Sequence, residues 1–428
     1  MTVIRRLFIL AWFLILLTTG CAPAPTNSNT TIVTTQPSSS PSPSPSPSTT
    51  NETTSNDVTL PLLDALLTDD KFVARVKENL KLNDQQIDEL KHVSGAAVAR
   101  LRESNAEDLD GNDTEAPQRA ADQLRATLGD MKARELTTLA NEYWSKGDVG
   151  EGSDDKVQML KGPNAVPADT RVVINIPAFR MDLFQDGSLV KSYKVGIGYP
   201  QFPLPQGLRK AQQIIFNPTW TPPDSPWVAK MKNVSPGETV EAGDKDNPLG
   251  PIKIPIGLPS LIHGGKSPAK IGKFASHGCV GLTNAQVKDF AALLAQASNT
   301  TEVPTKMATY LADKEKTQTV KLNQPVPVEL RYETIVLEDG KLYIYRDVYA
   351  QNTNTEANLR RVLEANGIKL EDLPEQQQTE ILNAVNSKPR KDIVIDLGTV
   401  AQQKGYPAPV DLDTGNADKR GSKPRIKS

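Results

Sequence analysis

The spacing of apolar residues changes from helical to strand-like near residue 170, and this change constrains the fold most. Two strands are predicted in RVVINIPAFRMDLFQDGSLVKSYKVGIG, joined by the hairpin-type turn signal Gln185-Asp186-Gly187. Further strands with glycine-rich ends are predicted in IPIGLPSLIHGG and GKFASHGCVGL. A helix is expected from Asn284 through Ala297, where apolar residues supply one face. Residues 170–350 are therefore predicted to form a mainly β domain with a short helix.

Helical spacing dominates on both sides of this domain. Residues 57–160 are predicted to form a small helical segment of two or three helices, one of which starts after the N-cap Asn83. His92 has no Cys or second His at ligand spacing, so it is interpreted as a solvated or structural histidine. Residues 351–428 are predicted to form a C-terminal extension that is helical to about Asn386 and then basic and disordered. The apolar stripes of the N-terminal segment are Leu62, Leu63, Leu66 and Leu67; Ile87, Leu90, Ala97, Val98 and Leu101; and Leu124, Leu128, Met131 and Leu139.

The N-terminus has the layout of an export signal. In residues 1–20, Arg5 and Arg6 precede an apolar run that is too short for a comfortable membrane span, and small residues follow it. Cys21 comes directly after Thr-Thr-Gly, which resembles the lipobox of bacterial lipoproteins. We therefore expect lipid on Cys21 and attachment to a membrane, with the chain facing the periplasm or the outer side. An ordinary signal peptide with an incidental cysteine is the alternative.

Residues 22–56 consist almost entirely of Ser, Thr, Pro and Asn. Such a composition cannot bury enough apolar surface to fold, so residues 21–56 are predicted to be a lipidated cysteine followed by a disordered linker. A flexible chain of this length spans roughly 30 Å, and a proline-stiffened one approaches about 100 Å. The linker therefore suits a protein that is fixed to a membrane and works on a layer some distance away.

Composition excludes several classes of protein. The chain has 49 Lys and Arg against 51 Asp and Glu, a formal net charge of -2, which argues against a protein that mainly neutralises nucleic acid. No Gly-rich phosphate-binding loop is apparent, and no cofactor is predicted. A chain of 428 residues buries a core without disulfides, which agrees with its two cysteines.

Two of the three histidines and one of the two cysteines lie together in LIHGGKSPAKIGKFASHGCVGLTN, residues 261–284. A thiol that attacks carbonyl groups must lose its proton, and an imidazole beside it can accept that proton, so His263 and Cys279 are the candidate pair. Three lysines and no acidic residue lie between Leu261 and Leu282, which favours a thiolate and an anionic substrate. A backbone carbonyl, that of Gly264, is the expected orienting group for His263, since no carboxylate is near in sequence. Backbone N–H groups near Cys279 are candidates for an oxyanion site.

Other interpretations of this cluster stay open. A zinc site needs three or four ligands, and the segment offers three candidates without a CxxC pair, so no metal is predicted. The cysteine could instead be buried and inert beside two satisfied histidines. A third alternative is a domain that has lost its catalytic activity and now only binds.

The block from His263 through Ser276-His277-Gly278-Cys279, followed by Val280 and Asn284, resembles the signature of the L,D-transpeptidases, which have a YkuD-type catalytic domain. The likeness extends to NPTWTPP at residues 217–223, DNPLGP at 246–251 and a closing hairpin in PVPVELRYETIVLEDGKLYIYRDVY. That hairpin resembles the ErfK-like subgroup, which includes the lipoprotein-anchoring enzymes. The resemblance covers about 180 residues and implies a β-sandwich catalytic domain.

The resemblance also implies an activity on peptidoglycan. Cys279 would attack the third residue of a tetrapeptide stem, release the terminal D-Ala and hold the stem as a thioester, and an amine would then form a 3-3 cross-link or anchor a protein. His263 would serve as general base and acid, Gly264 would orient it, and His277, Gly278 and Ser276 would support the oxyanion site. Trp220, Lys273 and Asn284 are candidates for substrate binding. The partners implied are peptidoglycan stem peptides and, for anchoring, a protein acceptor.

One departure from the family pattern bears on activity. The family usually has Arg two residues after the cysteine, whereas this chain has Gly281. Lys266, Lys270, Lys273 or Arg209 are possible substitutes for that cation. Two alternatives therefore accompany the transpeptidase interpretation: an L,D-carboxypeptidase, in which water accepts the stem, and a non-catalytic peptidoglycan-binding lipoprotein.

Overall fold

The computed structural model describes residues 58–103, 116–146, 158–222, 228, 231–257, 259–402 and 404–415. The predicted signal peptide, Cys21, the linker and the basic tail lie outside these residues. The described residues form four hydrophobic clusters. One lies in an N-terminal helical segment, one in a central β domain and one in a C-terminal domain, and a smaller one joins Val173 and Phe184 of the central domain to Val336 and Tyr406. None of the described helices combines the length and the apolar character that a membrane span needs.

The N-terminal segment contains five described helices, α1–α5, rather than the two or three predicted. Helix α2 ends at Lys81 in a left-handed conformation, and α3 starts behind Asn83, whose side chain accepts a hydrogen bond from the N–H of Gln86 at 2.8 Å. These sharp breaks divide the apolar stripes into short helices. The helices are α1 (Leu60–Leu66), α2 (Asp70–Leu80), α3 (Asp84–Glu103), α4 (Ala116–Leu128) and α5 (Asp130–Lys146).

The segment makes direct contact with the central domain. The side chain of Thr59, which caps α1, donates a buried hydrogen bond of 2.6 Å to the carbonyl of Gln201. Gly207 at the start of β5 (Gly207–Phe216) lies against Ser145 of α5, where a Cβ would come within 3.0 Å of the Ser145 carbonyl oxygen. The helices therefore pack on the strand and loop side of the central domain rather than standing apart as a spacer.

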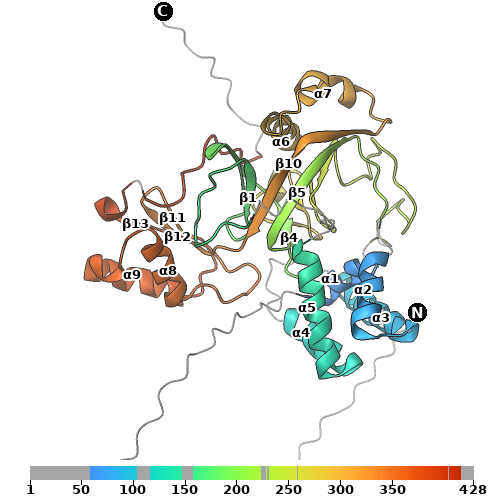
Figure 1. Ribbon diagram of the computed structural model, residues 1–428, viewed down its shortest axis with the longest axis horizontal. Coiled ribbons are helices and arrows are strands. Elements are labelled where there is room, and N and C mark those ends of the chain that lie inside the picture. The colour runs from blue at the N-terminus through green and yellow to red at the C-terminus, as the bar shows by residue number, and fades with distance from the viewer. Residues whose placement is uncertain are drawn as a thin grey trace, which may run out of the picture. The chain divides into compact units, whose positions relative to one another are not determined.

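The central domain is built on one mixed sheet of eight strands in the order β3-β2-β1-β10-β5-β6-β7-β9 (Figure 1). β10 pairs with β1 in parallel and with β5 in antiparallel orientation, so it joins the two halves. The turn between β2 and β3 has Asp186 and Gly187 at positive φ, as its sequence predicts. The other strands of the sheet are β1 (Arg171–Asn175), β2 (Arg180–Gln185), β3 (Ser188–Lys194), β6 (Ile252–Pro255), β7 (Leu261–His263), β9 (Val280–Gly281) and β10 (Gln318–Arg331).

The two ends of this sheet meet. Gly196, two residues after the end of β3, forms a pair of 2.8 Å backbone hydrogen bonds with Gly281 of β9, the strand at the opposite end of the sheet. Next to it, β4 (Ile197–Gly198) pairs in parallel with β8 (Phe274–Ser276). The sheet therefore curls around its own apolar core, which confirms the predicted mainly β catalytic fold.

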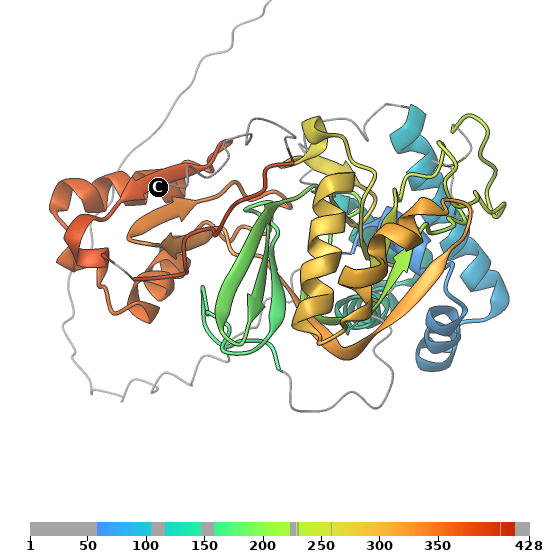
Figure 2. The same ribbon diagram turned by 90° about the horizontal axis from the view of Figure 1, so that it is seen from above.

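Helix α6 (Asn284–Ala297) has the predicted bounds, set by a capping box between Thr283 and Gln286. Its buried side, including Val287 and Phe290, packs against β6 and β10, and α7 (Glu302–Ala312) lies beside it (Figure 2). The short 3-10 helix η2 (Pro268–Lys270) lies in the loop between β7 and β8.

Charged side chains are buried along β1 and β10. Glu329, 1% exposed, accepts hydrogen bonds from Arg171 and from Nε of Arg331 at 2.9 Å. A second buried group joins Arg180 of β2 to Asp182 and to Glu338. These ion pairs fix strands whose register would otherwise depend on apolar contacts alone.

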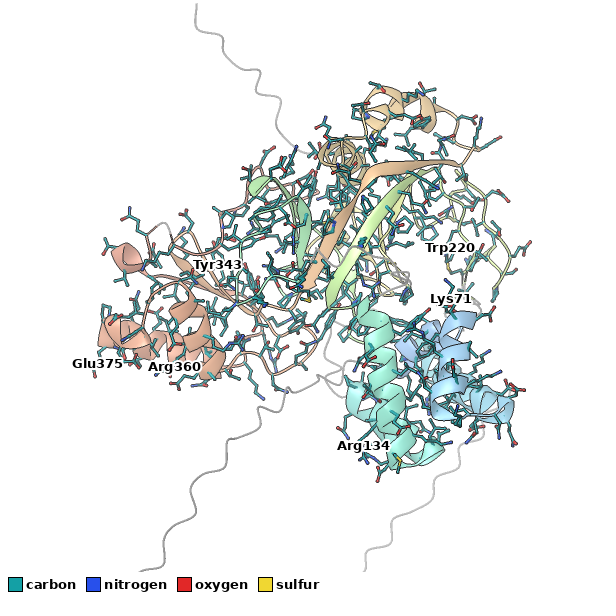
Figure 3. The ribbon with its side chains drawn as sticks, viewed as in Figure 1. Lys71, Arg134, Trp220, Tyr343, Arg360 and Glu375 are labelled. Carbon is teal, nitrogen blue, oxygen red and sulfur yellow. The ribbon has the colours of Figure 1, made fainter. Side chains whose placement is uncertain are left out.

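The C-terminal domain has its own three-stranded sheet, β11-β12-β13, covered by α8 and α9. Prediction placed residues up to 350 in the catalytic domain, but the hairpin β11–β12 pairs with β13 and packs into the C-terminal core, so the boundary falls near Thr334. Arg360 on its outer side bridges Glu356 and Glu371 (Figure 3). The elements are β11 (Ile335–Glu338), β12 (Lys341–Ile344), α8 (Glu356–Ala365), η3 (Leu370–Asp372), α9 (Glu375–Asn386), β13 (Ile393–Asp396) and η4 (Gly398–Ala401).

After this domain the chain returns to the central one. The N–H of Ser192 in β3 donates to the carbonyl of Val410, and the N–H of Asp413 donates to the carbonyl of Ser192, both at 3.0 Å. Lys194 donates its N–H to Asp413 at 2.9 Å. Residues 410–413 therefore cover the free edge of β3, although they were predicted to be part of a helical or disordered extension.

Candidate active site

Cys279 lies in the tight turn between β8 and β9. The hydroxyl of Ser276 accepts the Cys279 N–H at 3.0 Å and donates to the Cys279 carbonyl oxygen. Both backbone polar groups of the cysteine are therefore held by one buried serine, which fixes the direction of the Cys279 side chain. Ser276 is a positioning residue in this geometry.

The register of β7 and β9 places His263 on the same side of the sheet as Cys279. The two strands are parallel, with Ile262 opposite Val280 and His263 opposite Gly281. Continuing this register by two residues puts Leu261 opposite Cys279, so His263 and Cys279 are diagonal neighbours. Diagonal neighbours on one face are about 7–8 Å apart at Cα, within reach of an imidazole and a thiol.

His263 is buried, with 3% of its surface exposed. Burial and the nearby ammonium of Lys266 lower its pKa to about 3, while the backbone carbonyls of Gly264 and Leu249 act in the opposite direction. Its Nδ1 has no hydrogen-bond partner among the described residues. A neutral imidazole with a buried, unpaired nitrogen is suited to accept a proton from a neighbouring group.

Cys279 is partly exposed and has a protonated thiol at rest. Burial raises its pKa, and the opposing effects of the Leu261 backbone and the Lys266 ammonium are smaller. The Lys266 ammonium lowers the pKa of Cys279, the direction predicted for the local lysines, but burial raises this pKa by more. The pair is a neutral thiol beside a neutral imidazole, so deprotonation has to accompany attack.

Lys266 covers the position of Gly281. A Cβ placed on Gly281 would lie 2.7 Å from Cγ and 2.8 Å from Cε of Lys266. The Lys266 ammonium acts on both His263 and Cys279, and its own pKa is lowered by burial. The lack of a side chain at residue 281 therefore makes room for Lys266. This lysine places a cation near the thiol although the family's usual arginine is replaced by Gly281.

The fully buried Arg209 is not a substitute for this cation. Its Nη1 donates to the carbonyls of Ile256 and Gly257, at 3.2 and 2.8 Å, and burial lowers its pKa to about 9. These contacts tie Arg209 to the loop after β6.

Fewer backbone N–H groups are available to bind an oxyanion than the sequence indicates. The Cys279 N–H is engaged by Ser276, so it is not available to a ligand. Gly278 has a φ of +92°, its carbonyl accepts a 2.8 Å hydrogen bond from the buried Ser260, and no described residue accepts its N–H. A Cβ on Gly198 would lie 3.2 Å from this nitrogen, which shows how closely β4 approaches the turn. The Gly278 N–H is the group best placed to bind an oxyanion.

The ring of His277 packs in an aromatic group instead of facing His263. Its centroid lies 4.6 Å from that of Phe202, edge to face, and 5.7 Å from that of Tyr199. His277 therefore supports the turn through its ring contacts with Phe202 and Tyr199.

The three residues predicted to bind substrate have separate locations. Asn284 accepts the Gly265 N–H at 2.8 Å, so it holds the glycine pair after His263. Trp220 pairs through its backbone with Val240, in a loop that no described contact joins to Cys279. Lys273 lines a pocket beside the loop that holds η2. The structure therefore does not bring the three together.

Sequence reasoning missed Ser260 and Leu249. Ser260 holds Gly278 from a strand connection, and the Leu249 carbonyl acts on His263 from a loop before β6. No pattern in the neighbouring sequence indicates either role, because each residue acts on a segment that is brought close only by the folded structure.

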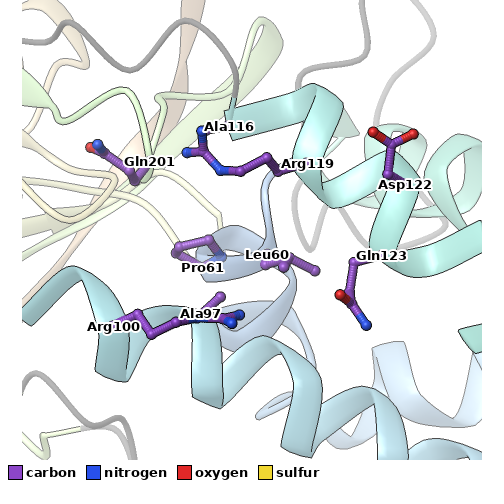
Figure 4. A pocket seen from close by; sticks show the side chains of 9 residues that line it. All are labelled: Leu60, Pro61, Ala97, Arg100, Ala116, Arg119, Asp122, Gln123 and Gln201. Carbon is purple, nitrogen blue, oxygen red and sulfur yellow. The ribbon is translucent and has the colours of Figure 1, made fainter. Parts of the chain in front are cut away.

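Two further observations concern ligands. Within the described part of the chain, no group of three or more His, Cys, Asp or Glu side chains could hold a metal ion. A pocket of about 570 Å³ lies at the helical segment, where it is lined by Leu60, Pro61, Ala97, Arg100, Ala116, Arg119, Asp122, Gln123 and Gln201 (Figure 4). None of these residues belongs to the cysteine turn.

Residues 169–321 match the family model of the L,D-transpeptidase catalytic domain, and this range includes β7, β8, β9 and both members of the pair. The chain is also 21% identical over 183 residues to a Bacillus licheniformis protein named as an L,D-transpeptidase, YkuD. The aligned residues make up 42% of this chain and 93% of that protein. These matches support an L,D-transpeptidase catalytic domain in this chain. The matched range of the family model lies within the central domain.

Solved L,D-transpeptidases show weaker likeness. The catalytic domain of the Enterococcus faecium enzyme is 16% identical, with a TM-score of 0.26, over 39% of this chain and 100% of that one. An enzyme from Mycobacterium tuberculosis is 15% identical, with a TM-score of 0.23, over 39% of this chain and 58% of that one. An avibactam carbamoyl enzyme is 14% identical, with a TM-score of 0.25, and the chain spans about half of it, 49%.

Replacing Lys266 with methionine tests its effect on the thiol. The substitution keeps the length of the side chain and removes the charge, so the pKa of Cys279 should rise further and thiolate should form only at higher pH. The measurement is the rate of alkylation by iodoacetamide against pH, followed by intact mass. The profile of Lys266→Met should move to higher pH, while that of Lys288→Met, an exposed lysine on α6, should not. If the alkylation rates of all three proteins depend on pH in the same way, Lys266 has no effect on the Cys279 thiol.

Proposed function

We propose that this chain is a peptidoglycan L,D-transpeptidase with Cys279 as nucleophile and His263 as general base and acid. The single observation that carries the proposal is the parallel register of β7 and β9, which puts these two side chains on one face within the matched domain. The buried, neutral imidazole and the clamped cysteine turn support it.

The first half of the reaction is acylation. The Cys279 sulfur attacks the carbonyl carbon of the third residue of a tetrapeptide stem, meso-diaminopimelate, while His263 takes the thiol proton. The carbonyl oxygen becomes an oxyanion that the Gly278 N–H can bind. The carbon–nitrogen bond to the terminal D-Ala then breaks, and His263 gives its proton to the leaving amine. A thioester to Cys279 remains.

The second half transfers the stem to an acceptor. An amine, in the simplest case the side chain of another stem's third residue, attacks the thioester carbonyl and loses a proton to His263. The carbon–sulfur bond breaks, and the proton returns to the sulfur. The product is a 3-3 cross-link, or a protein joined to the wall where the amine belongs to a protein.

We further propose that the domain acts while tethered to a membrane. Cys21 follows a signal-like leader, and residues 22–56 consist almost entirely of Ser, Thr, Pro and Asn, with little apolar surface to bury. A lipid on Cys21 would hold the catalytic domain within reach of the wall. Growth with a labelled fatty acid, followed by purification, tests this: label should be present on the wild type and absent from Cys21→Ser.

Intact-protein mass spectrometry tests the activity. The protein is incubated with a tetrapeptide muropeptide and, separately, with a carbapenem, alongside its Cys279→Ala variant. The wild type should gain a covalent adduct in both cases and release D-Ala from the muropeptide, whereas the variant should gain none. A wild type that remains unmodified under both conditions would contradict the catalytic proposal and favour a binding role.

A further inference from the structure

A second pocket, of about 710 Å³, lies between the central and C-terminal domains. The central domain contributes the end of β3, the residue after β4 and the loop 267–274, and the C-terminal domain contributes Arg346 and residues 390–392. The lining residues are Phe179, Lys194, Tyr199, Ser267, Ala269, Lys270, Gly272, Lys273, Phe274, Arg346, Arg390, Lys391 and Asp392.

The pocket is strongly cationic. Six of its lining residues carry a positive charge, and Asp392 carries the one negative charge. No acidic side chain among the described residues lies within ion-pair distance of these six cations. Lys194 is the most enclosed of them, with Nζ donating to the Ala178 carbonyl at 2.8 Å. A chain with a net charge of -2 has therefore gathered a net positive charge in one concave place, which Asp392 offsets only in part.

Aromatic rings form the floor of the pocket. Phe179, Tyr199 and Phe274 are buried at 8–9% exposure, and Phe179 meets Phe274 edge to face at 5.8 Å. The guanidinium of Arg346 lies over the Phe274 ring at 5.2 Å, which holds this cation at the pocket. An apolar floor with a cationic rim suits an organic molecule that carries several carboxylates rather than a bare inorganic anion.

The floor leads toward the reactive cysteine. Tyr199 contacts both Phe274 and His277, and His277 is two residues before Cys279. From Phe274 to Cys279 the chain advances five residues, about 16 Å if fully extended. An extended stem of three or four residues spans roughly 10–14 Å. The turn that holds Cys279 makes the true separation shorter than the extended length, so a stem with its carboxylates in this pocket has a length suited to reach the thioester.

We propose that this pocket binds the carboxylates of the second peptidoglycan stem, the one whose amine resolves the thioester. The assignment rests on the transpeptidase function proposed above. It gives the C-terminal domain a role in the choice of acceptor, because that domain supplies three of the six cations. In this arrangement Lys266, next to Cys279, is the cation available to bind the donor stem.

The test separates acylation from transfer. Arg390→Glu/Lys391→Glu reverses two exposed charges in the C-terminal wall, and Lys341→Glu/Arg361→Glu makes the same change on exposed residues of that domain that do not line the pocket. Each protein is given a tetrapeptide donor and increasing tripeptide acceptor, and the thioester, the 3-3 dimer and the hydrolysed tripeptide are measured. The pocket variant should acylate at the wild-type rate and form at least about tenfold less dimer at low acceptor, since each lost charge-assisted contact weakens binding severalfold. Arg390→Gln/Lys391→Gln should also form less dimer, with a smaller decrease. It replaces the charge-reversal variant if that variant unfolds at a clearly lower temperature than the wild type.

Several results would overturn the proposal. One is a dimer-to-hydrolysis ratio in the pocket variant equal to that of the Lys341/Arg361 control. Another comes from calorimetry on the Cys279→Ala protein, if a tripeptide with amidated carboxylates binds as tightly as the free acid. Binding of a glycerol phosphate polymer in preference to the tripeptide would assign the pocket to phosphate ligands instead. If the wild type forms no thioester, the proposed function fails, and the calorimetric comparison still decides whether the pocket takes stem carboxylates.

Discussion

Replacing His263 with glutamine should lower the rate of Cys279 acylation at pH 7 by about 10²–10⁴-fold, the range of a general base. Glutamine keeps a similar volume in a buried position and cannot take the thiol proton. Burial raises the pKa of Cys279, so little thiolate is present at neutral pH without a base. The measurement is the second-order rate of carbapenem adduct formation by intact mass.

The dependence on pH identifies the cause of this loss. In His263→Gln the rate should rise as pH increases through the raised pKa of the thiol, so the deficit should shrink in alkaline solution. In the wild type the rate requires a neutral imidazole, and because the pKa of His263 is lowered to about 3, activity should persist well below pH 6.5. His92→Gln, an exposed histidine on α3, is the matched control and should behave as wild type. A deficit that stays constant from pH 6 to pH 10 would mean that His263 has a structural role only.

The largest expected loss of stability comes from Glu329→Gln. This carboxylate, 1% exposed, is shared by Arg171 and Arg331, and its removal leaves two buried guanidinium groups with less opposite charge beside them. Breaking a buried ion pair from one side costs about 3–5 kcal/mol. We expect the lower end, about 3 kcal/mol, because Arg171 keeps Asp169 at 2.6 Å, and Arg331 keeps Glu333 at 3.9 Å and a 2.7 Å hydrogen bond to the Ala165 carbonyl.

Urea unfolding provides the measurement. The midpoint for Glu329→Gln should fall well below that of the wild type, while Glu356→Gln, which removes an exposed i,i+4 pair with Arg360, should cost at most about 1 kcal/mol. Equal midpoints for the two variants would show that the buried network contributes no more than a surface pair.

Local signals allowed parts of the fold to be predicted. Helix α6 begins after Thr283 because a capping box and an apolar face agree there, and Asp186-Gly187 makes the expected turn. The hairpin β11–β12 was placed in the wrong domain, because its third strand, β13, follows about fifty residues later and leaves no mark on the hairpin itself.

The candidate site, like the fold, could be predicted from the sequence only in part. Residue type and spacing were enough to select Cys279 and His263 as candidates. They gave no access to the β7–β9 register, to the burial that keeps the thiol protonated, or to the place of Lys266 over Gly281. Each of these depends on which segments meet after the sheet has curled, and one sequence does not contain that information in any local pattern.

The returning segment at residues 410–413 has a consequence for solubility. β3 is the outer strand of an eight-stranded sheet, and without this segment its N–H and C=O groups would face solvent along an open edge. Such edges recruit strands from other molecules and start aggregation. A chain that ended before Tyr406 would keep its catalytic pair and lose this protection. Residues 410–413 therefore occupy backbone groups of β3 that would otherwise be open to pairing with a strand of another molecule.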